Sequence, residues 1–434
     1  MTEPRPARRR GPLAHVVVVG AGFGGINATK ALMDEPFEIT LVDRDNYHGF
    51  WPLLYQVATA GLSADDIAHP VRDLFASRAN VHVRLGVVSK VDVAERAVHL
   101  EDGTTLAYDY LVLAAGSSTA DFGVPGVAEH AFPLKTLADA VRVRNHILGR
   151  FERADAHPEL VARGILTFVL AGGGPTGVEM AGALAELIGR NLARDFTHLD
   201  VTAARIVVVE MADHLLGGFA PISQQSALST LQGRGVDVRL GATITKVGAD
   251  LVELADGTAI PCGTVVWTAG VKANRVADAL GVAQVRGGQV VVNRDLSLPG
   301  HPEVFIVGDL AAAQDRHGAR HPQLAQVAIQ GGRHAGRSIR RLNSGRPTRP
   351  FRYHNHGIMA TIGRRAAVAE LPGGLKLRGT PGWLAWLGVH LVFLVGFRNR
   401  AVVLLNWAWN YLTWDRASRI IMPDLWDARA DADR

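Results

Sequence analysis

Two glycine-rich turns, each directly after an apolar run, constrain this 434-residue chain more than any other feature. The first lies in HVVVVGAGFGGINATKAL and the second in LTFVLAGGGPTGVEMAGAL. Each stretch predicts a strand, a tight turn and a helix, which is the context in which a G-x-G-x-x-G pattern indicates a dinucleotide site. Two such units on one chain predict two bound dinucleotides, and therefore electron transfer between them.

The glycine spacing meets the physical demands of a pyrophosphate site. The first glycine permits the tight turn, the second lets the backbone approach the phosphates, and the third lets the helix pack closely on the strand. The phosphates then lie at a helix N-terminus, where free N–H groups and the helix dipole favour negative charge. The residues expected to form the two turns are Gly20, Gly22, Phe23, Gly24 and Gly25, and Gly172, Gly174, Pro175, Thr176 and Gly177.

An acidic residue at the end of the following strand is expected to bind a ribose hydroxyl. FEITLVDRDN places Asp43 there, close to the usual offset of about 20 residues. ARIVVVEMAD ends at Glu210, a longer offset, because NLARDFTHLDVTAA predicts an extended helix and loop in between. Acids at both strand ends favour NADH over NADPH, although Arg44 and Arg205 leave that choice open.

Length and charge narrow the class of protein. The length predicts about three domain equivalents, and the glycine- and alanine-rich composition is typical of α/β packing. The net charge of +5 is spread along the chain apart from an ARRR segment, so nucleic-acid binding is not indicated. We expect residues 1–13 to be a disordered basic tail, which could also touch anionic lipid. The apolar run after it is the first strand rather than a signal peptide, so we expect the nucleotide domains in the cytosol.

Cysteine usage excludes one class of redox chemistry. Cys262 is the single cysteine, so the chain has neither an internal disulfide nor a redox dithiol. It lies in the strand-like PCGTVVWTAG and is expected to be buried. Disulfide reductases and sulfide:quinone reductases are disfavoured, because both use redox cysteines. We predict no metal site.

The chain contains an internal repeat. From about residue 14 to 125, and again from about 164 to 290, a βαβ pattern is followed by short strands and a D-G-T hairpin signal. HPEVFIVGDLAAA then predicts another strand, ending at Gly308 and Asp309. We therefore expect an α/β fold with two Rossmann-like domains, the second inserted in the first. The predicted domains are 14–163, 164–298 and 299–380, the last resuming the first domain.

The tail changes character at about residue 381. PGWLAWLGVHLVFLVGF is nearly all apolar but slightly short of the roughly 20 residues of a spanning helix. AVVLLNWAWNYLTWDRASRIIM mixes leucine and valine with tryptophan, asparagine and tyrosine, and Trp and Tyr favour membrane interfaces. For 381–434 we favour two amphipathic helices in the interface of one leaflet over a true span. A buried, dimer-forming helix pair is the soluble alternative.

Two glutamines stand one turn apart on a predicted helix. LAQVAIQGGRHAGRSIRRL places Gln326 and Gln330 on one face. Composition alone suggests a solvated face. Because Leu324, Val327 and Ala328 surround them, a pocket wall is the alternative.

With these motifs in place, the chain resembles the type II NADH dehydrogenases, non-pumping NADH:quinone oxidoreductases of the two-dinucleotide-binding-domain flavoprotein superfamily. The resemblance covers roughly residues 14–422. Its motifs are the two turns, LVLAAGS, FIVGDLA, NYHGFWPLLYQVATAGLSADDIAHPVR, AGGGPTGVEMAGALAEL, AQVAIQ and the tail VHLVFLVGFRNRAVVLLNWAWNYLTWDR. The last two are the most specific, because soluble reductases of the superfamily lack them. The chain departs at Ala114-Ala115-Gly116, where many relatives have Ala-Thr-Gly.

The resemblance implies two ligands with different roles. The first turn and Asp43 would hold the adenosine diphosphate part of a tightly bound, non-covalent FAD, and Asp309 would help to hold its flavin end. The second turn and Glu210 would hold NADH as a substrate. Segments 14–163 and 299–380 would then form the FAD domain, with the quinone site in the second of them, and 164–298 the NADH domain. The other expected cofactor-binding residues are Arg44, Val88, Ala115, Gly116, Gly270 and Gly308.

The resemblance also implies a route for electrons. Glu179 would position the nicotinamide or assist proton movement, the alternative being an acid stabilised by the helix dipole. Gln326 and Gln330 would donate hydrogen bonds to a membrane quinone of the menaquinone or ubiquinone type. The protein would be a peripheral homodimer on the cytoplasmic face of the plasma membrane, attached through 381–422. A soluble ferredoxin or rubredoxin reductase and a membrane-bound NADH-sensing flavoprotein remain as alternatives.

Overall fold

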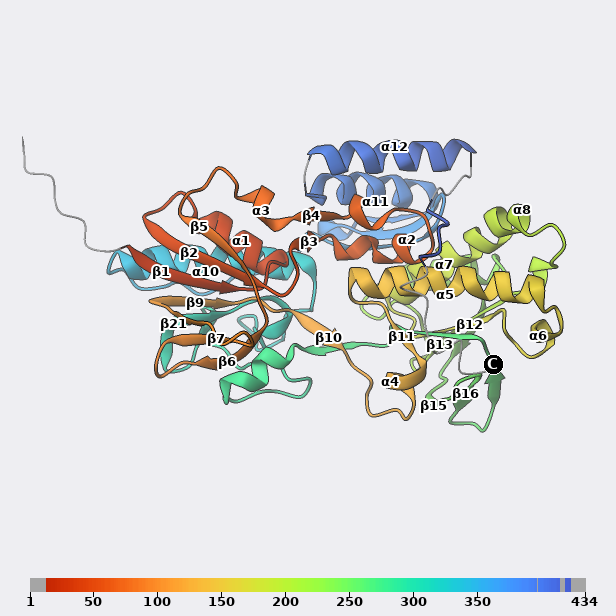
Figure 1. The fold of residues 1–434 in the computed structure, drawn as a ribbon, viewed down its shortest axis with the longest axis horizontal. Coiled ribbons are helices and arrows are strands. Elements are labelled where there is room, and N and C mark those ends of the chain that lie inside the picture. The colour runs from red at the N-terminus through yellow and green to blue at the C-terminus, as the bar shows by residue number, and fades with distance from the viewer. Residues whose placement is uncertain (1–12, 396, 414–417, 423–434) are drawn as a thin grey trace, which may run out of the picture. The chain divides into compact units, whose positions relative to one another are not determined.

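The computed structural model describes residues 13–395, 397–413 and 418–422 (Figure 1). The chain forms two compact units. Unit 1 comprises Met1–His48, His69–Ser118 and Lys272–Asn355, and unit 2 comprises Gly49–Ala68, Thr119–Val271 and His356–Arg434. Apart from Leu13, the predicted basic tail lies outside the described residues.

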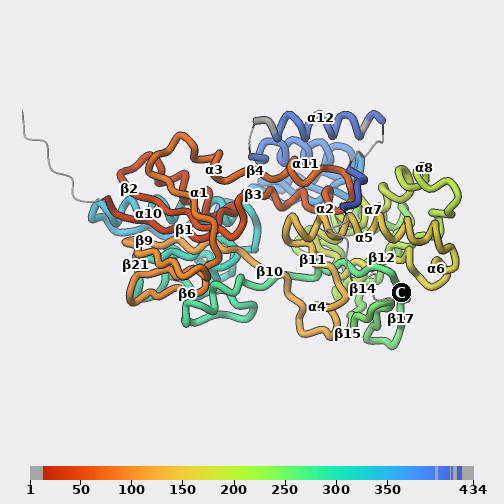
Figure 2. The backbone as a smooth tube through the Cα atoms, in the orientation of Figure 1, coloured from red at the N-terminus to blue at the C-terminus, as the bar shows by residue number. Residues whose placement is uncertain are grey.

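The chain enters each unit more than once. In Figure 2 the early red segment and the later cyan segment both belong to unit 1. The chain therefore returns to unit 1 after most of unit 2, as expected for one dinucleotide domain inserted in another. The short strands β3 (Tyr47–Gly49), β4 (Ala68–Pro70), β10 (Ser117–Thr119) and β19 (Val271–Ala273) lie where it passes from one unit to the other.

Unit 1 is built on a mainly parallel sheet with the strand order β20-β21-β9-β1-β2-β5. Its strands are β1 (Ala14–Val19), β2 (Phe37–Asp43), β5 (Val81–Leu85), β9 (Tyr110–Leu113), β20 (Ser297–Leu298) and β21 (His301–Ile306). β20 alone runs antiparallel to its neighbour in this sheet. The central valines Val16, Val17 and Val18 are fully buried, which explains their continuous apolar run.

Helices α1 (Phe23–Leu32) and α10 (Ala325–Asn343) pack closely against each other in unit 1. A side chain at Gly332 would overlap the backbone of Gly24, and a Cβ at Gly336 would lie 2.6 Å from the Cβ of Ala31. Small residues on α10 therefore allow this approach. Unit 1 also contains helix α3 (Val71–Leu74), the antiparallel strands β6 (Val88–Asp92), β7 (Ala97–Leu100) and β8 (Thr105–Ala107), and 3-10 helices at Arg275–Leu280 and Gly308–Leu310.

Unit 2 repeats this plan with the parallel strand order β11-β18-β12-β13-β14. Its strands are β11 (Phe132–Pro133), β12 (Thr167–Ala171), β13 (Arg205–Glu210), β14 (Asp237–Leu240) and β18 (Thr264–Trp267), followed in a separate antiparallel sheet by β15 (Ile244–Val247), β16 (Leu251–Leu254) and β17 (Ala259–Pro261). β12, β13, β14 and β18 correspond to β1, β2, β5 and β9. The predicted repeat and the two Rossmann-like domains are confirmed.

The helices of the repeat explain its unequal spacing. Helix α7 (Pro175–Glu186) continues through a π-helical segment, Leu187–Leu192, into α8 (Ala193–Asp195), and a 3-10 turn follows at Val201–Ala203. This confirms the extended helix and loop predicted before Glu210. The remaining helices of the repeat and its connections are α4 (Val127–His130), α5 (Leu137–Ala156), α6 (Glu159–Ala162) and α9 (Pro221–Gln232).

The C-terminal part of unit 2 forms a small sheet and two helices. Strands β22 (Ile358–Gly363), β23 (Ala366–Glu370) and β24 (Lys376–Arg378) precede α11 (Gly379–Phe393) and α12 (Phe397–Thr413). Polar side chains of α12 bind the segment around α2 (Leu54–Ala58): Asn399 donates to the Ala68 carbonyl at 3.1 Å and Asn410 to the Gly61 carbonyl at 3.1 Å. No helix among the described residues is long and apolar enough to cross a membrane.

The compact units differ from the predicted domain boundaries. Residues 49–68, 119–163 and 356–380 lie in unit 2, although the sequence order placed them with the first domain, and 272–298 lies in unit 1. The reason is packing between distant segments. Helix α7 packs on β22, and α2 packs on α5 and α7, contacts that motif order does not reveal.

Candidate functional site

The first turn, residues 20–25, combines crowded glycines with one open one. Gly20 has φ +99°, and a Cβ there would lie 2.5 Å from the Ala114 carbonyl oxygen. A side chain at Gly25 would overlap the carbonyl oxygen of Gly20, and a Cβ at Gly24 would lie 3.0 Å from Val307. At Gly22, in contrast, no described atom lies within 4 Å of an added Cβ. This space opens at the N-terminus of α1, which no described side chain caps, and it suits a pyrophosphate.

Asp43 closes β2 next to this turn. Its carboxylate accepts hydrogen bonds from the backbone N–H of Ala21 and, at 2.9 Å, from that of Asp45. Burial raises the pKa of this carboxyl, and the two backbone hydrogen bonds oppose the rise. Asp43 therefore fixes the turn as well as standing at the expected ribose position.

Asp309 lies in the same unit as the first turn, as predicted. The Ser117 hydroxyl donates to its carboxylate at 2.6 Å. Gly308 has φ +68° and Gly116 has φ +67°, and no described atom lies within 4 Å of a Cβ added to Gly116. Ala115 is half-buried against the core of unit 1. Gly116 therefore offers a second open stretch of backbone in unit 1, whereas a Cβ at Gly308 would lie 3.1 Å from the Cβ of Ala328.

Two further predicted cofactor residues lie in peripheral positions of unit 1. Val88 begins β6 and packs, half-buried, against the core of that unit. The side chain of Arg44 is 56% exposed and forms an ion pair with Asp45 at 3.4 Å. A cofactor contact at Val88 or Arg44 stays a prediction.

The second turn, residues 172–177, reproduces the first. Gly172 has φ +106°, and a Cβ there would lie 2.6 Å from Cα of Ala269. A side chain at Gly177 would overlap the carbonyl oxygen of Gly172, whereas no described atom lies within 4 Å of a Cβ at Gly174. Pro175 and Thr176 are exposed at the start of α7, which no described side chain caps.

Gly270 packs against the segment that contains Ala120 and Phe122. A Cβ at Gly270 would lie 2.7 Å from the ring of Phe122, which itself has φ +53°. Ala120 donates its N–H to the Gly270 carbonyl at 3.1 Å. Gly270 is therefore required by packing within unit 2.

Glu210 plays the part of Asp43 in unit 2. Its carboxylate accepts from the backbone N–H of Gly173 at 2.6 Å and of Ala212 at 2.8 Å. Arg205 begins the same strand, so it lies at the end of β13 away from the turn. There it forms an ion pair with Asp237 at 3.7 Å. The acid and not this arginine faces the turn, which supports an unphosphorylated ribose.

Glu179 is the most perturbed acid of unit 2. It is 8% exposed on α7 and accepts a hydrogen bond from the Thr361 backbone N–H at 3.3 Å. Burial raises its pKa to about 8, while Thr361 and the Trp386 indole oppose the rise. A dipole-stabilised acid would show the reverse shift, and Glu179 lies beyond the first turn of α7. The raised pKa disfavours the dipole-stabilised alternative, and a role of Glu179 in positioning the nicotinamide or moving a proton stays a prediction.

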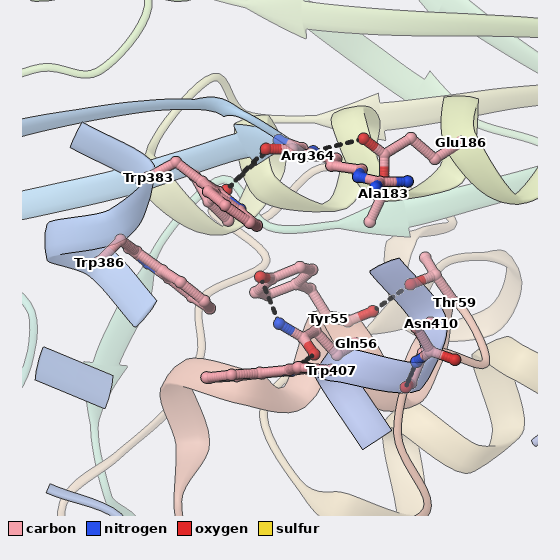
Figure 3. Close-up of a pocket in the computed structure, with 13 residues that line it drawn as sticks. Tyr55, Gln56, Thr59, Ala183, Glu186, Arg364, Trp383, Trp386, Trp407 and Asn410 are labelled. Atoms are coloured by element: carbon pink, nitrogen blue, oxygen red, sulfur yellow. Dashed lines mark hydrogen bonds between the residues drawn. The ribbon is translucent and has the colours of Figure 1, made fainter. Parts of the chain in front are cut away.

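Figure 3 shows a pocket of unit 2, and its lining includes Thr361 and Trp386, the two residues that interact with Glu179. The pocket is partly open to solvent, and its empty volume, including that open part, is about 620 Å³. Trp386, 1% exposed, packs against Tyr55 and Trp407 with ring centroids 6.4 and 5.7 Å apart. Gln56 joins the Tyr55 hydroxyl, at 2.8 Å, to the Trp407 indole N–H, at 2.9 Å. The full lining is Tyr55, Gln56, Thr59, Gly61, Ala183, Glu186, Thr361, Gly363, Arg364, Trp383, Trp386, Trp407 and Asn410.

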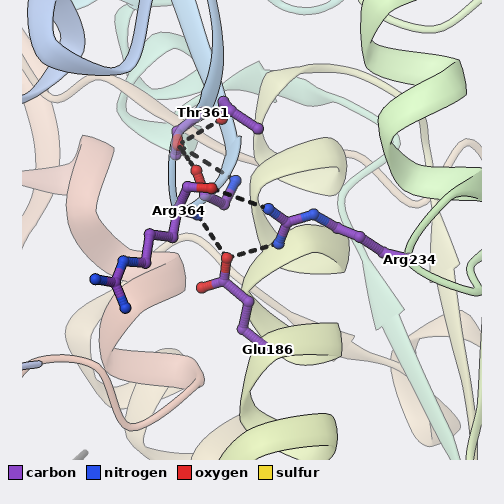
Figure 4. A network of polar contacts seen from close by, with 6 residues as sticks. Glu186, Arg234, Thr361 and Arg364 are labelled. Atoms are coloured by element: carbon purple, nitrogen blue, oxygen red, sulfur yellow. Dashed lines mark hydrogen bonds and ion pairs between the residues drawn. The ribbon is translucent and has the colours of Figure 1, made fainter. Parts of the chain in front are cut away.

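A polar network fixes the strand that carries Thr361 (Figure 4). Glu186 accepts from Arg234 at 2.6 Å and from the Arg364 backbone N–H at 2.5 Å. Arg234 also donates to the Arg364 carbonyl at 3.2 Å. Gly363 has φ +123°, and a side chain there would collide with both Glu186 and Arg234. The network ties the β22–β23 turn to α7 and so orients the Thr361 N–H toward Glu179.

The predicted glutamine pair lies in unit 1, on α10. Gln330 donates to the His354 carbonyl at 2.8 Å and accepts from the His354 N–H at 2.9 Å. Its amide therefore ties α10 to residue 354 and keeps one further N–H hydrogen. Gln326 is half-buried. The three predicted catalytic residues thus belong to both units, and Glu179, the one in unit 2, interacts with two residues that line the pocket of that unit.

Several structural partners were not singled out as site residues from the sequence. His48, Ser117, Thr361 and Trp386 bind or contact predicted site residues, yet each has an ordinary sequence context. Cys262 is buried, as predicted, and burial raises its thiol pKa to about 12. No group of three or more His, Cys, Asp or Glu residues in the described part of the chain could hold a metal ion.

Comparison with known proteins agrees with this geometry. The family model of the pyridine nucleotide-disulphide oxidoreductases matches residues 14–332, and that of the NDH2 C-terminal domain matches 355–414. Two type II NADH:quinone oxidoreductases of Mycobacterium tuberculosis are each 40% identical to the chain. The alignments cover 96% and 95% of this chain, and 91% and 90% of the two mycobacterial proteins. The chain belongs to the type II NADH:quinone oxidoreductases.

Solved structures show the same fold for this type II enzyme. NDH2 from Plasmodium falciparum in complex with NADH has a TM-score of 0.87 at 18% identity, covering 94% of this chain and 99% of that one. A sulfide:quinone oxidoreductase from Aquifex aeolicus has a TM-score of 0.71 at 20% identity, covering 92% and 95%. The family match confirms the resemblance found in the sequence, and the family is FAD-dependent.

Proposed function

We propose that the chain transfers electrons from NADH, bound at the second turn, through FAD, bound at the first turn, to a membrane quinone. The overall reaction takes NADH, a proton and quinone to NAD⁺ and quinol. One observation carries the proposal: each of two repeated units places one open glycine at an uncapped helix N-terminus, beside a strand-ending acid. Bound FAD would supply the redox chemistry, accepting a hydride equivalent and releasing two electrons.

The residues of the chain supply binding, orientation and a proton. The two turns bind the pyrophosphates, and Asp43 and Glu210 bind the riboses. Glu179 is protonated below its pKa of about 8, so it can hold a proton near neutral pH in a buried place. Gln326 and the remaining N–H of Gln330 are proposed to donate hydrogen bonds to the quinone. Membrane-embedded proton-carrying helices are not part of this scheme, so proton pumping is not proposed.

The apolar face of α11 and α12 supports attachment to a membrane surface. Its exposed side chains repeat at helical spacing and are 36% to 82% exposed: Leu384, Val389, Val392, Phe393, Leu404, Leu405, Trp409 and Leu412. Trp386 and Trp407, on the opposite faces, are buried, so two of the tryptophans expected at a membrane interface serve the core instead. We propose that this exposed apolar face lies in one leaflet of the plasma membrane, on the cytoplasmic side, where a quinone dissolves.

Stopped-flow absorbance tests the reaction. The purified holoenzyme is mixed with NADH and then with a menaquinone or ubiquinone analogue. Bleaching of the flavin by NADH, followed by reoxidation by one of the quinones, is the expected result, and the faster quinone identifies the acceptor class. Reoxidation by a ferredoxin or rubredoxin alone would favour the soluble-reductase alternative. Slow bleaching without reoxidation would favour the sensor.

Vesicle flotation tests the attachment. Leu405→Asp places a charge on the exposed apolar face, at a side chain that is 67% exposed, and should strongly reduce flotation with anionic vesicles. Leu85→Asp is the matched control, because Leu85 is 52% exposed on β5 of unit 1. Equal flotation of the two variants would contradict the proposed surface. Light scattering of the detergent-solubilised protein tests the homodimer that the family resemblance implies.

A further inference from the structure

His48 holds the residue that follows the first glycine of the first turn. It is 2% exposed, and its Nδ1 lies 2.8 Å from the carbonyl oxygen of Ala21. Because a carbonyl oxygen only accepts, Nδ1 carries the hydrogen and donates it. The ring also meets Phe23, the first residue of α1, edge to face, with centroids 5.4 Å apart.

This hydrogen bond sets the direction of a neighbouring N–H. The Ala21 carbonyl and the Gly22 N–H belong to one planar, trans peptide group, so they point in opposite directions. When His48 fixes the carbonyl, it turns the Gly22 N–H to the side away from the imidazole. Gly22 is the open position of the turn, where no described atom would contact a Cβ within 4 Å. Asp43 fixes the preceding peptide through the Ala21 N–H.

The Nδ1 donor does not depend on the charge of the ring. Burial lowers the pKa of His48 to about 4, with smaller contributions from Lys30 and His69, while the hydrogen bond to Ala21 opposes the shift. In the neutral ring the Ala21 carbonyl selects the tautomer that carries its hydrogen on Nδ1, and a protonated ring would carry a hydrogen there as well.

Unit 2 meets the same geometric need by another means. The Gly173 carbonyl, at the equivalent position, accepts from the backbone N–H of Leu216 at 2.8 Å. Leu216 adopts φ +54°, an unusual conformation for a leucine. Two unrelated donors at one equivalent carbonyl indicate that the direction of this peptide matters in both turns.

We propose that His48 is a positioning residue of the FAD site, which orients the Gly22 N–H toward the pyrophosphate by holding the Ala21 carbonyl. The proposal rests on the proposed binding of FAD at the first turn. It concerns the adenosine diphosphate part of FAD and does not involve the NADH turn.

The test compares His48→Asn with His48→Leu, two side chains of similar shape. The asparagine amide can replace the Nδ1–H donor, and the leucine cannot. Apoprotein of each variant is titrated with FAD by flavin fluorescence, and with ADP, which carries only the part that this turn holds, as a competitor. For His48→Leu we expect both the Kd of FAD and the Ki of ADP to rise by roughly ten- to hundredfold, and for His48→Asn by less than about threefold.

His390→Leu is the matched control in unit 2. His390 is also buried, has a pKa lowered to about 4, and places Nδ1 2.8 Å from the carbonyl of Trp386. Its replacement should lower thermal stability and leave the affinities for FAD and ADP unchanged. Wild-type affinity in His48→Leu, or equal losses in His48→Asn and His48→Leu, would overturn the proposal. Failure of wild-type apoprotein to bind FAD would instead overturn the proposed function.

Discussion

The two glycine turns share one plan but differ in what holds them. In both, a strand-ending acid accepts the N–H of the residue after the first glycine, Asp43 from 22 residues away and Glu210 from 37. The carbonyl of that residue accepts from a side chain, His48, in unit 1, and from a backbone N–H, that of Leu216, in unit 2. One side-chain substitution can therefore release this carbonyl in the first turn, whereas the equivalent carbonyl of the second turn is held by a backbone donor.

The helices after the turns differ as well. Two residues after the third glycine, α1 carries Asn27 and α7 carries Glu179. Asn27 is half-buried and neutral, and its amide binds the Phe23 carbonyl at 2.9 Å and Arg333 at 3.0 Å. Glu179 is buried, and none of the described residues that shift its pKa is a cation. The two units thus share the turn and the strand-ending acid. At this position of the helix, only unit 2 carries a titratable side chain.

Replacing the third glycines should separate the two sites most strongly. In Gly25→Val the new side chain would overlap the Gly20 carbonyl oxygen. We therefore expect the affinity of this variant for FAD to be at least about a hundredfold lower. Gly177→Val should retain FAD and lose NADH-driven bleaching to a similar degree. Flavin absorbance per chain and stopped-flow bleaching measure the two effects. Loss of flavin from both variants would show that the turns are not separate sites.

Replacing the open glycines should weaken binding and spare the fold. An added methyl at Gly22 or Gly174 meets no described atom within 4 Å, so the melting temperature should change little. The methyl occupies phosphate space, so we expect roughly ten- to hundredfold weaker binding of FAD for Gly22→Ala and of NADH for Gly174→Ala. Calorimetry and ligand titration measure these changes. A large loss of stability with unchanged affinity would contradict the assignment of these spaces.

Glu179→Gln should remove a pH dependence of the free energy of unfolding. Asn27, at the equivalent position of α1, does not titrate and so contributes no such dependence. The native carboxyl keeps its proton up to about pH 8, and the unfolded one loses it near 4.5, so between these values the unfolded state binds fewer protons. Wild-type stability should therefore fall as pH rises, by up to about 1.4 kcal/mol for each pH unit in that window. Denaturant unfolding at several pH values should show a flatter profile for Glu179→Gln.

Turnover supplies the second half of this test. If Glu179 carries a proton during the reaction, Glu179→Gln should lower turnover by about tenfold or more. Asn27→Ala is the matched control on α1 and should leave the pH profile of turnover unchanged. Unaltered turnover and NADH affinity in Glu179→Gln would leave the residue with a packing role alone.

Replacing the strand-ending acids Asp43 and Glu210 should have the smallest effect, a change in the preference for NADH over NADPH. Glu210→Gln keeps an oxygen for the Gly173 N–H but removes the negative charge that disfavours a ribose phosphate. We expect the ratio of kcat/KM for NADH to that for NADPH to fall by about tenfold. Asp43→Asn should leave this ratio unchanged, because Asp43 belongs to the other turn. A change of the ratio in Asp43→Asn would contradict the assignment of the two ligands.

Local patterns predicted much of the fold. The glycine spacing, the apolar strands and the D-G-T hairpins depend on neighbours in the sequence, and the hairpins form at Gly103 and Gly257, with φ +83° and +85°. The acids at Asp43 and Glu210 were also found, because each simply ends a strand. The unit boundaries were not predicted, since α2, α5 and the β22–β23 hairpin are assigned by packing and carry no boundary signal.

The sequence by itself determined that the chain has two dinucleotide turns with an acid beside each, because these features depend on backbone conformation over a few residues. Only the tertiary structure decided the chemical state of the side chains around them. Glu179 owes its raised pKa to burial, and its contacts with Thr361, 182 residues away, and with Trp386 oppose part of that rise. His48 becomes a donor to the first turn because folding buries it beside Ala21. Burial and partners from distant segments set protonation, and a linear pattern does not encode them.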